Sequence, residues 1–287
     1  MSPHPPHEIA LGALRLGAGS PLFLIAGPCV IESESHACGM AEKIARIAAD
    51  CAVPYIFKAS YDKANRSSLK SFRGPGLAEG LRILKKIQKD FAVPVLTDIH
   101  ESSQAAPAAE MCDILQIPAF LSRQTDLLVA AAKTGRIINV KKAQFLSPWD
   151  MTNVVEKISA TGNEQIILTE RGASFGYNNL VVDMRAFPVM QKLGYPVVYD
   201  VTHSVQLPSA SHGDEDGAAT SGGQPEFIET LARAGVAAGV DGIFLETHDN
   251  PSAALSDGPN ALPLAQLPSL LKRLKQVAEL VRSWSPR

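Results

Sequence analysis

The sequence predicts a single (β/α)8-barrel domain over residues 1–287. Eight short and nearly uninterrupted apolar runs alternate with longer amphipathic stretches. Parallel strands that are buried on both faces have this composition, and eight strand–helix units in series close into a barrel. A doubly wound open sheet is the alternative, although it usually has fewer repeats.

The predicted strands begin with apolar residues and end with polar ones. Buried strands need short runs of branched and aromatic side chains, whereas amphipathic helices need apolar residues that recur with a period near 3.6. The main predicted helices cover residues 40–50, 76–90, 125–133, 150–159 and 227–238. The predicted strands cover residues 21–29, 55–60, 93–100, 114–118, 137–142, 165–171, 197–203 and 242–248.

Two segments lie outside the strand–helix units. Residues 1–20 precede the first strand, and their alternating pattern predicts a small β-hairpin that caps the barrel bottom. Residues 204–224 follow the seventh strand and include a polar stretch rich in Gly, Ser and Asp. Loops at this end of a barrel cover active sites, so we expect a mobile loop over the pocket, with a tolerated surface insertion as the alternative.

The composition excludes several classes of partner. With 27 basic and 29 acidic residues the net charge is −2, so the chain has no bulk attraction for nucleic acid or for an anionic membrane. No apolar run approaches the roughly 20 residues of a membrane span, and residues 1–19 lack the pattern of a signal peptide. The four cysteines form no CxxC pair, as in a reduced cytosolic protein. We therefore expect a cytoplasmic protein that binds small molecules.

The polar strand ends predict one shared pocket. In a parallel barrel all carboxyl ends of the strands lie on the same rim, so residues far apart in the sequence meet there. A single polar strand end can simply emerge into water, but eight in register favour a common site. Five cations near these ends suit a ligand with several negative charges. They are Lys58, Lys63, Arg66, Lys141 and Arg171.

A second subset offers ligands for a metal ion. Cys29, His203, Glu246 and Asp257 provide thiolate, imidazole and carboxylates, which suit a borderline divalent metal. No local spacing motif supports this site. The alternatives are a small buried thiol, a hydrogen-bonded rim histidine and a helix N-cap. A Schiff-base lysine at Lys58 or Lys141 is a further alternative for the chemistry of the pocket.

The segments at the predicted strand ends resemble the 3-deoxy-D-manno-octulosonate 8-phosphate synthase family. The resemblance runs from about residue 22 to 270, and motifs of this length and order are specific. It implies the condensation of phosphoenolpyruvate with D-arabinose 5-phosphate and water, a step of lipopolysaccharide sugar biosynthesis that releases inorganic phosphate. The segments are residues 25–33, 57–68, 72–76, 97–101, 116–128, 139–145, 168–183, 200–208 and 244–264.

One segment separates this family from a close relative that uses erythrose 4-phosphate. The relative carries a Lys-Pro-Arg-Thr pattern after the second strand, whereas residues 63–68 here read KANRSS, similar to the arabinose 5-phosphate enzymes. The resemblance implies that Asn65, Arg66 and Ser67 bind the sugar phosphate. The erythrose 4-phosphate synthase and a non-catalytic phosphosugar-binding barrel are the alternatives.

The resemblance also implies a cofactor and an assembly. Metal-independent members carry Asn at the position of Cys29, so the chain is similar to the metal-dependent members and is expected to bind Mn, Fe, Co or Zn through Cys29, His203, Glu246 and Asp257. Arg123 is expected to reach the sugar phosphate of a neighbouring subunit, which implies a homotetramer. The residues expected to hold phosphoenolpyruvate are Lys58, Lys63, Gln116, Lys141, Gln144 and Arg171. The residues expected to act in catalysis are Lys58, Asp98, His100, His203 and Asp257.

Overall fold

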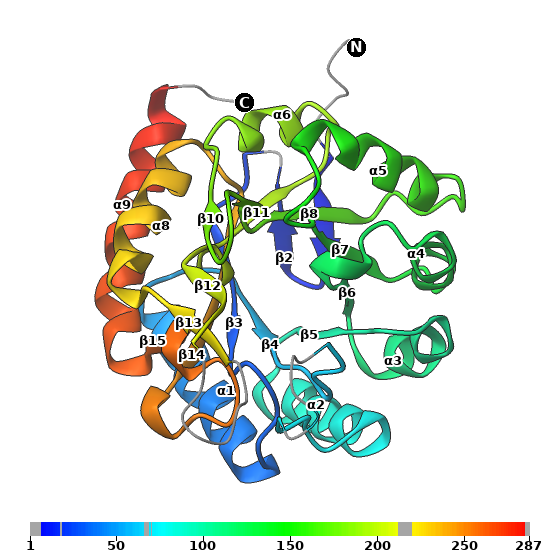
Figure 1. Ribbon diagram of the computed structural model, residues 1–287, viewed down its shortest axis with the longest axis vertical. Helices are drawn as coiled ribbons and strands as arrows, with labels where there is room; N and C mark the ends of the chain where they lie inside the picture. Colours follow the sequence, from blue (N-terminus) through cyan, green and yellow to red (C-terminus); the bar gives the residue numbers. More distant parts are fainter. Residues whose placement is uncertain (1–6, 18, 66–68, 70, 212–219, 285–287) are drawn as a thin grey trace.

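Eight parallel strands form a closed barrel in chain order (Figure 1). The computed structural model describes residues 7–17, 19–65, 69, 71–211 and 220–284. Each barrel strand pairs with the next, and β14 pairs with both β11 and β3, so the ring closes and the predicted fold class is confirmed. The strands are β3 (Phe23–Gly27), β4 (Tyr55–Lys58), β5 (Val95–Asp98), β6 (Ile114–Ile117), β7 (Ile137–Lys141), β8 (Ile166–Glu170), β11 (Val197–Asp200) and β14 (Gly242–His248).

Helices surround the barrel on its outer side (Figure 1). Most predicted helices lie within one or two residues of the observed ones, but α1 begins at residue 34 instead of 40, because the Ser33 side chain accepts a hydrogen bond from His36 N and caps the helix there. None of the helices in the described ranges is long and apolar enough to cross a membrane. The helices are α1 (Glu34–Asp50), α2 (Leu77–Phe91), α3 (Ala105–Met111), α4 (Thr125–Ala132), α5 (Met151–Ser159), α6 (Ala186–Gln191), α7 (Val201–Ser204), α8 (Ile228–Ala237) and α9 (Leu267–Trp284).

Two apolar layers hold the barrel together. One lies between the strands and the surrounding helices, and the other fills the barrel interior. The hairpin of β1 (Ile9–Leu11) and β2 (Leu14–Leu16) packs against the interior layer through Ile9, Leu11 and Leu16. Full burial of one such side chain stabilises the fold by about 1.5–3 kcal/mol. The predicted hairpin cap is therefore confirmed, and the pocket lies at the opposite rim.

The prediction for the seventh strand, residues 197–203, is wrong at its carboxyl end. The strand stops at Asp200, and the next four residues form the short helix α7. The Asp200 side chain accepts a hydrogen bond from His203 N at 3.0 Å and so caps this helix. His203 consequently lies on a helical turn above the rim and not on a strand.

The segment after α7 begins and ends as an antiparallel pair. Its arms are β12 (Gln206–Ser211) and β13 (Thr220–Gly223), whereas residues 212–219 of the predicted mobile loop lie outside the described residues. A Cβ at Gly223 would lie 1.9 Å from Oδ1 of Asn260. The base of this hairpin therefore fits closely against the segment that follows Asp257. Shorter strands are β9 (Ala173–Ser174), β10 (Leu180–Val181) and β15 (Leu262–Pro263).

Candidate active site

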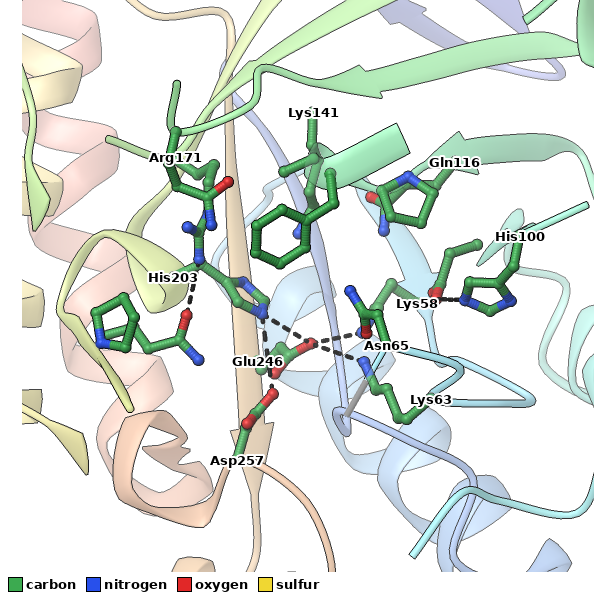
Figure 2. Close-up of a pocket in the computed structure, with 17 residues that line it drawn as sticks. Lys58, Lys63, Asn65, His100, Gln116, Lys141, Arg171, His203, Glu246 and Asp257 are labelled. Carbon is green, nitrogen blue, oxygen red and sulfur yellow. Dashed lines mark hydrogen bonds and ion pairs between the residues drawn. The ribbon is translucent and has the colours of Figure 1, made fainter. Parts of the chain in front are cut away.

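A cavity of about 200 Å³ opens among the carboxyl ends of the strands (Figure 2). Most residues singled out from the sequence line this cavity, so the structure brings them together. Arg123 is exposed and does not line it, and Arg66 and Ser67 lie outside the described residues. The predicted residues that line it are Lys58, Lys63, Asn65, Asp98, His100, Gln116, Lys141, Gln144, Arg171, His203, Glu246 and Asp257.

Two buried lysines in the cavity are paired with carboxylates. Lys58 Nζ donates to Glu246 Oε1 at 2.6 Å and to the Cys29 carbonyl at 2.9 Å. Lys141 Nζ donates to Asp200 Oδ2 at 2.6 Å and lies 3.6 Å from the centre of the Phe244 ring. Burial lowers the pKa of Lys141, and Asp200 opposes that shift. Burial alone would raise the pKa of Glu246, but Lys58, His203 and Lys63 hold it well below its usual range. Both carboxylates are therefore ionised and keep cations in the pocket.

Asp98 organises the opposite wall of the cavity. Its Oδ1 accepts a hydrogen bond from the Ser60 hydroxyl at 2.5 Å, and its Oδ2 lies 3.2 Å from His100 Nε2. Burial would raise the pKa of Asp98, but Lys63, His100 and Lys58 hold it below its usual range. The second ring nitrogen, His100 Nδ1, is buried and has no hydrogen-bond partner among the described residues. The His100 ring is thus oriented by a carboxylate on its Nε2 side.

Several buried polar atoms around the cavity lack partners within the described residues. They include Arg171 Nη1 and Gln144 Oε1. The other terminal nitrogen of Arg171 donates to Gln206 Oε1 at 2.9 Å, so the guanidinium is fixed in position. Because buried polar groups are normally hydrogen-bonded, such atoms favour a ligand that supplies the missing partners. An arginine with one nitrogen still available suits a phosphate or carboxylate oxygen.

A thiol, an imidazole and two carboxylates lie together at the side of the cavity. Ligand atoms of Cys29, Glu246 and Asp257 all lie within 4.8 Å of one another. His203 Nε2 lies 3.9 Å from Glu246 Oε1 and 4.0 Å from Asp257 Oδ2. Glu246 Oε2 is buried without a hydrogen-bond partner among the described residues. Burial, Asp257 and Glu246 raise the pKa of the Cys29 thiol to about 12, so a cation would be needed to hold it as a thiolate. These residues fit a borderline divalent metal.

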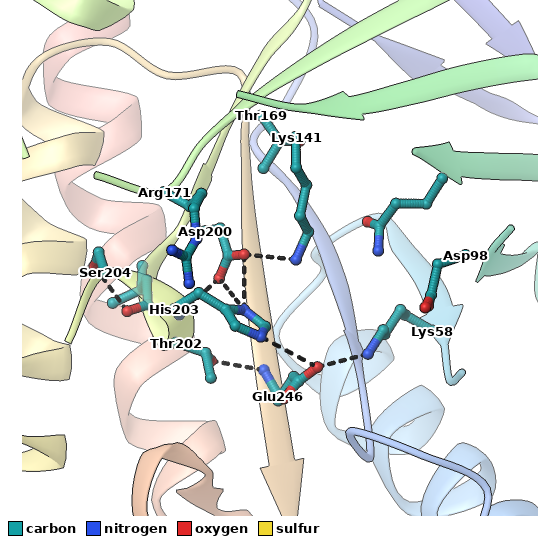
Figure 3. Close-up of polar contacts among 12 residues, drawn as sticks. Lys58, Asp98, Lys141, Thr169, Arg171, Asp200, Thr202, His203, Ser204 and Glu246 are labelled. Atoms are coloured by element: carbon teal, nitrogen blue, oxygen red, sulfur yellow. Dashed lines mark hydrogen bonds and ion pairs between the residues drawn. The ribbon is translucent and has the colours of Figure 1, made fainter. Parts of the chain in front are cut away.

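Asp200 contacts residues of the candidate site but was not singled out from the sequence (Figure 3). Its carboxylate is fully buried below the cavity and lies 2.8 Å from His203 Nδ1 as well as 2.6 Å from Lys141 Nζ. A carboxylate on one histidine nitrogen directs the other nitrogen toward a metal. Asp200 therefore links the metal-ligand set, through His203, to the cations of the cavity, through Lys141. Its place three residues before His203 was the available signal, since this spacing lets a carboxylate cap a helical turn.

Known proteins match this chain over nearly its full length. A model of the DAHP synthetase I family matches residues 7–283. A protein of Trichlorobacter lovleyi named 2-dehydro-3-deoxyphosphooctonate aldolase is 62% identical over 275 residues, covering 96% of this chain and 99% of that protein. Proteins with the same name from Geobacter metallireducens and Geobacter sulfurreducens are 60% and 56% identical over the same shares of the two chains.

Proposed function

Because the chain belongs to the DAHP synthetase I family, and because its relatives at 56–62% identity are named 2-dehydro-3-deoxyphosphooctonate aldolase, we infer that it is an enzyme of that activity. The reaction joins phosphoenolpyruvate to D-arabinose 5-phosphate and water. Its products are 3-deoxy-D-manno-octulosonate 8-phosphate, used in lipopolysaccharide sugar biosynthesis, and inorganic phosphate. The cytoplasm is the predicted location.

One observation carries this function: four cations and three carboxylates line a single small cavity, and a fourth buried carboxylate lies next to it. The cations are Lys58, Lys63, Lys141 and Arg171, the lining carboxylates are Asp98, Glu246 and Asp257, and the fourth carboxylate is Asp200, which pairs with Lys141. The carboxylates offset the repulsion between neighbouring cations such as Lys58 and Lys141. Two phosphorylated substrates would find positive groups on both sides, which offsets their mutual repulsion and the entropy of bringing them together.

The residues divide into two functional walls. Lys141 and Arg171, with Gln144, form the wall that would hold the phosphate of phosphoenolpyruvate, while Lys58 and Lys63 neutralise its carboxylate. The reaction then forms a bond from its third carbon to the sugar aldehyde while water adds at the second carbon. The resulting tetrahedral intermediate expels phosphate by cleavage of the carbon–oxygen bond. His100, which lies at the cavity wall beside Asp98, is the residue proposed to give or take the proton at the aldehyde oxygen.

Cys29, His203, Glu246 and Asp257 would hold a divalent metal beside this pocket. When bound, such a metal polarises a carbonyl oxygen or lowers the pKa of water. Manganese, iron, cobalt and zinc all suit the donors. Asp200 orients His203 for this role through its Nδ1 contact.

An oligomer with Arg123 reaching a neighbouring pocket is part of this proposal. Arg123 is exposed and is not among the described residues that line its own cavity. Large aromatic side chains are exposed on the loops after three neighbouring strands, β6, β7 and β8, which favours burial against other subunits. They are Phe120, Phe145, Trp149, Phe175 and Tyr177. A homotetramer is the expected assembly.

Release of inorganic phosphate tests the proposed function. Purified enzyme with phosphoenolpyruvate should release phosphate when given arabinose 5-phosphate and much less with erythrose 4-phosphate. Lys141→Met should lower kcat/KM by about 10²–10³, the range for one lost charge-stabilising donor, whereas the exposed Lys133→Met serves as the control. Faster release with erythrose 4-phosphate would assign the chain to the relative. Borohydride trapping of a lysine adduct would instead support a Schiff-base aldolase.

A further inference from the structure

A second group of metal-ligating side chains lies outside the cavity. Glu32 and His36 lie just before and on α1, and His248 and Asp249 lie at the end of β14. Ligand atoms of Glu32, His36 and His248 all lie within 4.8 Å of one another. We propose that these three residues bind a second divalent metal ion of the borderline class, such as Zn²⁺ or Co²⁺, at a site with no thiolate.

Each of the two histidine rings has one nitrogen near Asp249 and one directed at Glu32. His36 Nε2 and His248 Nδ1 lie 3.2 Å and 3.4 Å from Asp249 Oδ1. The other nitrogens, His36 Nδ1 and His248 Nε2, lie 4.0 Å and 3.4 Å from the Glu32 carboxylate oxygens. Two imidazoles and a carboxylate with an outer carboxylate behind the rings form a recurring arrangement in metal sites.

The inward-facing nitrogens are buried and lack hydrogen bonds within the described part of the chain. His248 as a whole is 6% exposed. Burying a polar atom without a partner destabilises the protein. A metal ion between the rings and Glu32 would satisfy both nitrogens at once. Ligands on one ion would be roughly 3.4 Å apart for bonds of about 2.1 Å, so small side-chain rotations would suffice.

Metal binding would change which ring nitrogen of His248 carries the proton. Asn250 N–H donates to His248 Nδ1 at 2.9 Å, which puts the ring proton on Nε2 in the neutral form. Metal binding at Nε2 would displace that proton, and the tautomer with Nδ1–H would donate to Asp249. This change of tautomer would require the Asn250 N–H to give up its hydrogen bond to Nδ1.

The proposed ion would tie α1 to the segment that carries Asp257. Glu32 Oε1 accepts a hydrogen bond from Leu255 N at 2.8 Å. The next residue, Ser256, has its hydroxyl 2.9 Å from Cys29 Sγ. Lys43 Nζ, 3.4 Å from Asp249 Oδ2, offsets one of the two negative charges here. The cluster thus keeps a net attraction for a cation. Leu255 and Ser256 connect it to Cys29 of the first metal-ligand set.

Cobalt binding tests the proposal, and Cys29→Ala isolates the new site. Wild-type protein dialysed against Co²⁺ should bind about two ions per chain, and Cys29→Ala should bind one that gives no thiolate-to-cobalt absorption band. Adding His36→Gln to Cys29→Ala should abolish this binding. Adding Asp249→Asn should weaken it by about 10–100-fold, as for other outer carboxylates. Glu34→Gln, on the same helix but paired with Arg82, is the matched control and should leave it unchanged.

Two results would overturn the site. One is a Cys29→Ala protein that binds no Co²⁺, and the other is binding that survives His36→Gln. Folding of each variant is checked by circular dichroism, and His36→Gln should fold because its side chain is partly exposed. Anomalous diffraction from a cobalt-soaked Cys29→Ala crystal gives a second reading, with a peak expected between the two rings. Phosphate release is measured separately, so failure of this site leaves the proposed activity untouched.

Discussion

Replacing Asp200 by Asn should both weaken metal binding and remove the ion pair that holds Lys141 in place. The carboxylate is fully buried and contacts Lys141 Nζ and His203 Nδ1 at 2.6 Å and 2.8 Å. Removing one partner of a buried ion pair costs about 3–5 kcal/mol. Asn keeps an oxygen that can accept one of these bonds, so the loss of stability should be nearer the 1.5–3 kcal/mol of a hydrogen bond to a charge.

The effect on the metal is the decisive part of this prediction. Outer carboxylates on metal-bound histidines contribute about 10–100-fold to metal affinity, which equals about 1.4–2.7 kcal/mol. Competition with a chromophoric chelator measures this affinity, and urea unfolding measures stability. The control is Asp113→Asn, which removes a partly buried carboxylate that accepts from Val95 N and Gln88 at the other end of the barrel. The proposed orientation of His203 would be refuted if Asp200→Asn loses stability as expected but binds the metal with an affinity within threefold of that of the wild type.

Three further predictions concern other parts of the pocket and the surface. Chelation should abolish phosphate release and Mn²⁺, Fe²⁺ or Co²⁺ should restore it, while Cys29→Ala should lose thiolate-bound metal and turnover together; a metal-free sample with full activity would contradict this. Because the folded pKa of Asp98 is depressed, its contribution to stability should be present above about pH 4 and be lost as the pH falls further. The stability gap between wild type and Asp98→Asn in urea unfolding should therefore narrow from pH 7 to pH 3, and an unchanged gap would argue against the Lys63 and His100 contacts. Trp149→Glu should dissociate the oligomer in light scattering, whereas the equally exposed Trp284→Glu should not.

The barrel could be predicted because its signal repeats. Each strand is a short buried run, and the eight runs recur with helical stretches between them. The hairpin that caps the bottom was also visible, since Ile9, Leu11 and Leu16 alternate with small or polar residues. The end of the seventh strand was not predictable from apolar pattern, because the cap at Asp200 converts the next residues into a helix.

The site could be predicted only as far as strand ends reveal it. Lys58, Lys141 and Glu246 follow apolar runs directly, so their meeting at one rim follows from barrel geometry. Asp200 was missed because Lys141 is distant from it in the sequence, and because His203 comes close to it only through the helical turn that follows the strand. His36 and His248 were missed for a similar reason, since one lies at the start of a helix and the other is the last residue of β14, and the two are more than two hundred residues apart in the sequence.

The pairing of β14 with β3, which closes the barrel, can form only late in the synthesis of the chain. Cys29 leaves the ribosome early, but Glu246 on the strand beside it is made more than two hundred residues later. At about 5–20 residues per second, the thiol waits roughly 10–40 s for its partners. A nascent chain cannot assemble the four ligands until β14 has paired with β3 and closed the ring. Loading of the proposed metal would therefore follow translation, and a truncated chain would carry the Cys29 thiol without the later ligands.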